Sequence, residues 1–246
     1  MAAVSPLTFL PLSVTIIGAA FAIVIFNHYF GTRKRPHELA WGIAFVLFAI
    51  AAATQVVADA SGNWTPFLAR TYYLTGAILN VAVLGLGTAY LLFSKRAASV
   101  ALVLTLLFAA VSTYVLFTVP VESAALNHSQ AVDWKAVFAV DRTPAWLAAI
   151  GSGVGTILVV GGAIWSGYTF WRKGIMKSRM VGVLLLAAGT FIVAAGGVLK
   201  GLMNNDHYLY PSMALGVIIM FVGYLQTIRP TPAATGKATQ TVPGQT

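Results

Sequence analysis

The 246-residue sequence has no cysteine, and it is poor in charged residues. Without thiols, the chain has no disulfide framework, no thiolate nucleophile and no cysteine-ligated metal site. Charged residues make up 9% of the chain, and only six residues are Asp or Glu. Because a water-soluble domain carries about 25% charged residues, we expect lipid to surround most of this chain.

Apolar residues are in excess and make up 59% of the sequence, with a mean hydropathy of +0.84. A helix needs about 20 apolar residues to cross a hydrocarbon core of about 30 Å, whereas barrel strands are about 9–11 residues long and alternate in polarity. The unbroken apolar runs therefore predict an all-α polytopic membrane protein with seven transmembrane helices. The predicted spans are Leu7 to Phe30, Glu38 to Ala58, Phe67 to Phe93, Ser99 to Val119, Ala145 to Trp171, Met180 to Leu202 and Leu209 to Ile228.

The charged residues fall into two unequal sets when they are sorted by the connections between these spans. One side carries eleven basic residues and one acid, Glu38, and the other carries four basic and five acidic residues. Lys and Arg collect on the cytoplasmic side of short loops, so we predict an N-terminus outside and a C-terminus in the cytoplasm. The basic residues of the predicted cytoplasmic side are Arg33, Lys34, Arg35, Lys95, Arg96, Arg172, Lys173, Lys177, Arg179, Arg229 and Lys237.

The formal net charge of +9 also bears on partners. Because the basic residues are divided among short loops and a tail, they do not form the continuous basic patch of a nucleic-acid-binding protein. Anionic lipid headgroups at the cytoplasmic face are the expected counterpart, at about 1 kcal/mol per basic residue near the surface. We expect the protein in a lipid bilayer, specifically the plasma membrane of a prokaryote.

The predicted domains are a seven-helix transmembrane domain over residues 1–229 and a disordered cytoplasmic tail over residues 230–246. The tail, "PTPAATGKATQTVPGQT", has no aromatic residue and is rich in Pro, Thr, Gly and Ala, a composition typical of disorder. It is too short for a catalytic domain, so any signal would have to pass to a separate protein, and another membrane protein is a candidate partner.

The longest connection runs from Pro120 to Pro144 and contains "VDWKAVFAVDR". Two interpretations stay open for it. It is either a short helix lying at the membrane interface with Trp134 as its anchor, or an ordered loop that caps the bundle.

A weak internal symmetry relates spans one to three to spans five to seven. Each set has a span ending in aromatic residues and a basic loop, then a small-residue span, then a span with Tyr near both ends. This three-plus-one-plus-three layout is the parallel repeat of some small sugar transporters. Chance similarity between apolar helices is the competing interpretation.

The stretch "FLARTYYLTG" places Arg70 one turn inside the third span. A lone charged side chain costs about 2.5–3.5 kcal/mol at the membrane midplane and less near the interface. Asp59 should lie at comparable depth on the neighbouring antiparallel span, so we predict that it pairs with Arg70. The alternative is that Arg70 reaches outward to the lipid headgroups.

Other polar residues are expected near the same outer level. If the helices close into a bundle, these residues could line one ligand-binding vestibule, and otherwise they form an ordinary wet interface. The candidate residues are Gln55, Asp59, Arg70, Tyr73, Asn80, Lys200 and Asp206. Asn80 is the deepest of them, and an interhelical hydrogen bond is the usual role of such an amide.

Groups for proton, haem or metal chemistry are not found where those functions need them. No acid lies near the midplane, which disfavours proton pumps and ion-coupled carriers. The histidines fall at span edges or in loops, and His28 and His37 beside Glu38 lack a metal-binding spacing, so we interpret them as solvated. We predict no catalytic residue, no metal and no cofactor.

The seven spans, the outside N-terminus and Arg70 within "FLARTY" resemble microbial rhodopsins, in topology and over about four residues. That resemblance would imply a retinal-binding lysine in the seventh span. Leu209 to Ile228 contains no lysine, and Tyr73 stands where a carboxylate counter-ion is expected. We therefore do not assign the chain to this family.

These observations predict a non-enzymatic integral membrane protein that acts in binding or interaction, as a sensor or as a subunit of a membrane complex. The alternative is a carrier or channel for a small neutral solute. A water-filled cavity reaching Asn80 would favour transport, and a dry core would favour interaction.

Overall fold

The computed structural model describes residues 9–32, 34–126, 132–173, 177–203 and 209–228. Seven helices in these residues are long and apolar enough to cross a membrane, and the described part contains no strand. The predicted fold class is therefore confirmed, and the orientation of the termini stays a prediction. The predicted tail lies outside the described residues. The elements are α1 (Phe9–Gly31), α2 (Pro36–Ser61), α3 (Pro66–Tyr72), the π-helix η2 (Tyr73–Leu79), α4 (Asn80–Leu92), α5 (Lys95–Thr118), the 3-10 helix η3 (Ser123–Leu126), α6 (Trp134–Val137), α7 (Thr143–Lys173), α8 (Lys177–Met203) and α9 (Leu209–Ile228).

Local sequence signals explain where several helices begin and end. Pro36 and Pro66 stand at the first positions of α2 and α3, where the missing N–H of proline costs no hydrogen bond. The Thr65 hydroxyl accepts a hydrogen bond from the Leu68 N–H at 3.2 Å and caps α3. Gly62, with φ of 73°, takes the left-handed conformation that ends α2.

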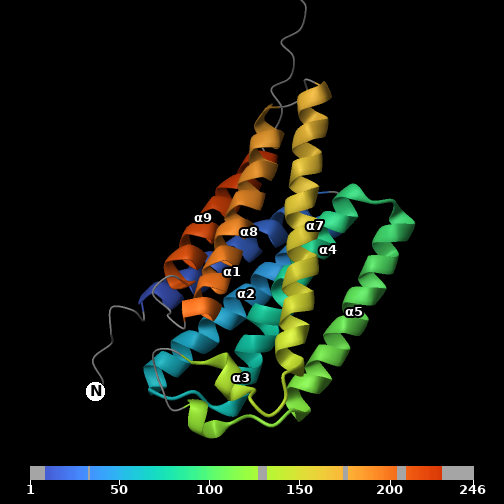
Figure 1. Cartoon of the computed structure of the whole chain (residues 1–246). Coiled ribbons are helices and arrows are strands. Elements are labelled where there is room, and N and C mark those ends of the chain that lie inside the picture. Colours follow the sequence, from blue (N-terminus) through green and yellow to red (C-terminus); the bar gives the residue numbers. More distant parts are fainter. Residues whose placement is uncertain (1–8, 33, 127–131, 174–176, 204–208, 229–246) are drawn as a thin grey trace, which may run out of the picture.

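Six spans form a closed ring, and α5 lies outside it (Figure 1). Around the ring, α1 contacts α2, α2 contacts α4, α4 contacts α7, α7 contacts α8, α8 contacts α9, and α9 returns to α1. Helix α5 contacts α4, η2 and α7, and most of its side chains are exposed. The two predicted sets of three spans therefore supply the ring.

Glycines let neighbouring ring helices approach closely. A Cβ atom on Gly85 of α4 would come within 2.8 Å of the Gly155 Cα atom on α7. Between α8 and α9, a Cβ atom on Gly182 would meet the Gly223 carbonyl oxygen at 2.7 Å. Small residues at helix crossings permit such backbone contact in membrane proteins.

The segment before α7 caps one end of the bundle. Val137 is fully buried and Phe138 is 2% exposed, and both belong to a core cluster with α3 and η2. The Trp134 ring stacks on the Tyr72 ring with centroids 5.1 Å apart. The segment therefore packs as a cap on the bundle, as the second interpretation predicts, but it contains the short helices η3 and α6 and is not a loop throughout.

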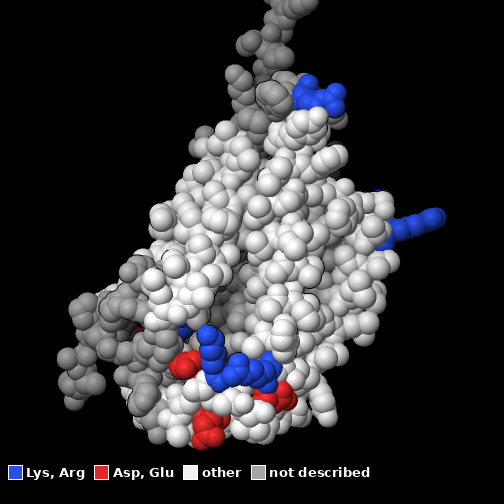
Figure 2. Space-filling view, viewed as in Figure 1, with Lys and Arg blue, Asp and Glu red and all other residues white. Residues whose placement is uncertain are grey.

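Charged side chains lie at the ends of the bundle. On the face in Figure 2, Lys and Arg appear alone at the end of α7 and the start of α5, whereas both signs appear at the end that holds α3 and α6. We call the end where α1 stops and α2 begins the basic end, and the opposite one the capped end.

Candidate functional site

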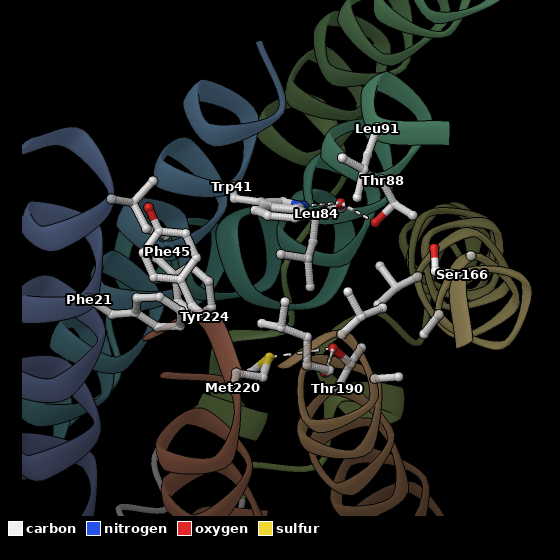
Figure 3. Close-up of a pocket in the computed structure, with 17 residues that line it drawn as sticks. Phe21, Trp41, Phe45, Leu84, Thr88, Leu91, Ser166, Thr190, Met220 and Tyr224 are labelled. Carbon is white, nitrogen blue, oxygen red and sulfur yellow. Dashed lines mark hydrogen bonds between the residues drawn. The ribbon is translucent and has the colours of Figure 1, made fainter. Parts of the chain in front are cut away.

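An apolar cavity lies inside the ring, and all six ring helices contribute to its wall (Figure 3). It offers about 30 Å³ to the centres of water-sized molecules, and a single water needs about 10–15 Å³ on this measure. The cavity as it stands therefore has room for about two or three water molecules, and a larger occupant would have to displace side chains of its wall. Its residues belong to the halves of the helices nearer the basic end, as the positions of Ile25, Trp41, Leu91, Val183 and Tyr224 show.

One wall of the cavity is aromatic and comes from α1, α2 and α9. Phe21, Phe45 and Tyr224 gather on this side, and Trp41 lies above them in Figure 3. The Phe21 ring lies 3.9 Å from the Phe45 ring and 5.5 Å from the Tyr224 ring, centroid to centroid. The Trp41 Nε1–H donates to the Leu84 carbonyl at 3.2 Å, which fixes the indole across the α2–α4 contact.

The other wall carries hydroxyl groups from α4, α7 and α8. Thr88 and Thr190 donate to the backbone carbonyls of Leu84 at 3.4 Å and Leu186 at 2.8 Å. Ser166 is 8% exposed, and within the described part of the chain its hydroxyl makes no hydrogen bond. Ser166 therefore offers a hydroxyl to a cavity occupant, while the two threonines already have backbone partners.

A polar cluster lies next to the aromatic wall at the basic end. The Glu38 carboxyl is 2% exposed, with its Oε1 atom 3.1 Å from His28 Nδ1 and 3.9 Å from His37 Nε2. The prediction that these are solvated loop residues is wrong for Glu38 and His37. Both lie in the first turn of α2, which begins at Pro36, and the His37 side chain is 14% exposed. The described residues contain no group of three or more His, Cys, Asp or Glu side chains placed to hold a metal.

The predicted pair between Asp59 and Arg70 is wrong. The Arg70 guanidinium donates from Nη2 to the Val119 carbonyl at 2.9 Å, and it lies 5.9 Å from the Phe117 ring. Among the described residues no ion pair joins it to Asp59, whose Oδ1 atom accepts from Gln55 Nε2 at 2.8 Å. The carbonyls at the end of α5 lack partners within that helix and carry partial negative charge, so they attract the guanidinium.

The other candidates of the predicted vestibule are divided between several places. Tyr73 and Lys200 both approach Trp134, with the Tyr73 ring 5.5 Å and the Lys200 Nζ atom 5.9 Å from its ring centre. Asn80 is half-buried and lies outside the cavity lining, and within the described residues its side chain makes no hydrogen bond. Asp206 lies outside the described residues.

The cavity residues were missed because each one looks like an ordinary apolar or helix-compatible residue. A usable signal was the grouping of Phe21, Trp41, Phe45 and Tyr224 at a similar depth in the first, second and seventh spans. Comparison with protein-family models, curated proteins and solved structures found no match to this chain. A functional proposal therefore depends on the site itself.

Proposed function

We propose that the protein is a non-enzymatic membrane receptor that binds a small apolar molecule inside the six-helix ring. The observation that carries this proposal is the apolar cavity with walls from all six ring helices. Cavities between helices of a bundle are common ligand sites. An occupant here would contact every ring helix at once, so it would favour one arrangement of the ring over others.

The chemistry of the wall supports binding rather than catalysis. The polar side chains that line the cavity are those of Trp41, Thr88, Ser166, Thr190 and Tyr224, and among the residues that the structure describes no carboxylate, imidazole or amine belongs to the lining. General acid–base or nucleophilic catalysis uses such groups or an activated hydroxyl. An apolar wall with a few hydroxyl groups is typical of recognition.

The proposed location and orientation of the protein follow from the unequal distribution of basic residues between its two ends. We place the basic end in the cytoplasm of a prokaryotic cell, with anionic headgroups as its lipid partners and another membrane protein as the receiver of the signal. A cysteine at Ser94, between α4 and α5, should then be protected from an impermeant thiol reagent in intact cells. Labelling without permeabilisation would reverse the orientation.

A pair of neighbouring alanines on α8 tests the cavity. Ala187 lines it, whereas Ala188 is exposed on the outer face of the same helix. Toluene should raise the thermal midpoint of the detergent-solubilised wild type and of Ala188→Leu, because a bound probe stabilises the folded state by mass action. It should have no such effect on Ala187→Leu, whose added side chain fills the cavity. An equal toluene response in both variants would contradict the proposal.

A carrier for a small neutral solute is the second candidate, and one observation favours it. Two sets of three spans form the ring and α5 lies outside, as a three-plus-one-plus-three repeat requires. Against it, Asn80 does not line the cavity. Stopped-flow measurements of glycerol entry into proteoliposomes decide the matter, since permeability equal to that of empty vesicles would argue against glycerol transport.

A further inference from the structure

Three of the five buried polar atoms without a hydrogen-bond partner in the described residues gather at the basic end. They are His28 Nδ1, Glu38 Oε2 and the Tyr224 hydroxyl oxygen. They come from α1, α2 and α9, and the His28 ring lies edge-on to the Tyr224 ring with centroids 6.3 Å apart. The contact between His28 Nδ1 and Glu38 Oε1 is 3.1 Å long, yet its geometry does not make a hydrogen bond.

Leaving buried polar groups unpaired is costly, at about 1–3 kcal/mol each and more for a charged group. Native structures pair nearly all of them. Glu38 Oε2 and the Tyr224 hydroxyl, whose residues both contact His28, are therefore candidates for a polar partner from outside the described chain. A water molecule and a ligand group are the two classes of partner to consider, and either would require neighbouring side chains to shift, because these atoms are almost completely buried.

The negative charge of an ionised Glu38 favours a cation as the polar partner at this site. Glu38 is the acid of this cluster. Its ion-pair partners among the described residues are His28 and His37, which carry a charge only when protonated, and no Lys or Arg there pairs with it. A positively charged donor near Glu38 Oε2 would offset the cost of burying the carboxylate. The Tyr224 hydroxyl can accept a second hydrogen bond from the same group.

The cluster adjoins the aromatic wall of the cavity. Tyr224 belongs to both, since its ring lines the cavity and its hydroxyl is one of the unpaired atoms. Trp41, also in the wall, follows Glu38 by three residues on α2 and lies 5.2 Å from the His37 ring. Aromatic faces attract ammonium groups. An apolar body in the cavity could thus place a cationic head at Glu38.

We propose that the ligand is a hydrophobic amine, with its apolar part in the cavity and its protonated amine between Glu38 and Tyr224. The proposal rests on the proposed function for the apolar half of the ligand. The position of the amine rests on the polar cluster alone. The apolar part and the amine part of the proposal can therefore be disproved separately.

Three probes of similar shape separate these parts: toluene, benzyl alcohol and benzylamine, which is charged at neutral pH. Their affinities are measured by thermal shift on the full chain in detergent. Wild type should bind benzylamine about tenfold or more tightly than benzyl alcohol, as expected when a hydrogen bond involves a charged group. Glu38→Gln should abolish this preference and leave toluene binding unchanged, which also shows that the variant is folded.

The matched control is Glu122→Gln, which neutralises an exposed glutamate at the capped end and should keep the full preference for benzylamine. Tyr224→Phe removes only the hydroxyl and should reduce the preference. Equal binding of benzylamine and benzyl alcohol to wild type would assign the cluster to water and overturn the proposal, as would a preference that survives Glu38→Gln. Failure of toluene to bind wild type would instead overturn the cavity proposal.

Discussion

The two ends of the bundle differ in how far their polar residues are paired. At the capped end, Arg70 donates from Nη2 to a helix-end carbonyl, Gln55 donates to Asp59, and Lys200 lies over Trp134, while the Arg70 Nε atom is buried without a partner in the described residues. At the basic end, Glu38 and Tyr224 each keep a buried polar atom without a partner in the described structure, beside an apolar cavity. The conspicuous polar residues of the sequence thus mainly hold the bundle together. The candidate site lies where the sequence looks ordinary.

The two ends should differ most when the same enlargement of a side chain is made at each. Ala69 of α3 is fully buried in the core of the capped end, and overpacking such a site costs about 1–3 kcal/mol. Ala69→Leu should therefore lower the thermal midpoint in detergent. Ala187→Leu, which adds the same atoms at the cavity, should be neutral or stabilising, by up to about 2 kcal/mol. Equal losses from both changes would mean that the cavity wall is as closely packed as the cap.

The next largest effect concerns Arg70. Arg70→Gln should destabilise the protein by about 1–2 kcal/mol, because it removes a charge-assisted hydrogen bond to the end of α5. The destabilisation by Asp59→Asn should add to that by Arg70→Gln within about 0.5 kcal/mol, since the two side chains share no bond in this structure. A double-mutant cycle by denaturation in detergent measures the coupling. A coupling energy well above that limit would restore the Asp59–Arg70 pair.

The smallest effect comes from Asp141, which is partly exposed and lies two residues before α7. The hydroxyl and the backbone N–H of Thr143 both donate to its Oδ1 atom, at 2.6 and 2.8 Å, and they hold its pKa below the usual 3.8. Because the folded-state pKa is depressed, this contribution to stability is present above about pH 4 and is lost as the pH falls through the folded value. Wild type and Asp141→Asn should differ slightly in thermal midpoint at neutral pH and converge in acid. A gap that stays constant with pH would contradict this.

The spans were predictable because the hydrophobic signal is long and local. The Asp59–Arg70 pair was not, because depth in the membrane follows from position in the chain, whereas the direction of a side chain depends on the rotation of its helix. Seven residues of the third span, Tyr73–Leu79, form a π-helix. That segment changes the angular relation between Arg70 before it and Asn80 after it, and standard helical spacing does not anticipate it.

The cavity was unpredictable for a different reason. The cavity is the space that side chains of six helices together leave unfilled. The size of that space cannot be derived from the sequence of any single segment. Glu38 was visible as the lone acid of the basic side. Its burial depended on how the first turn of α2 meets α1, which is a tertiary property.

The closed ring has a mechanical consequence. Short connections join α1 to α2, α2 to α3, α7 to α8 and α8 to α9, whereas two junctions of the ring lack one. Helices α4 and α7 are separated in the chain by α5, and α1 meets α9 although they are the first and last spans of the chain. Phe21 and Tyr224 face each other across this junction, and His28 reaches Tyr224 there. Side-chain contacts alone resist the separation of these two helices. A molecule bound at this point would act as a removable crosslink, and its departure would leave the ring free to open along one line.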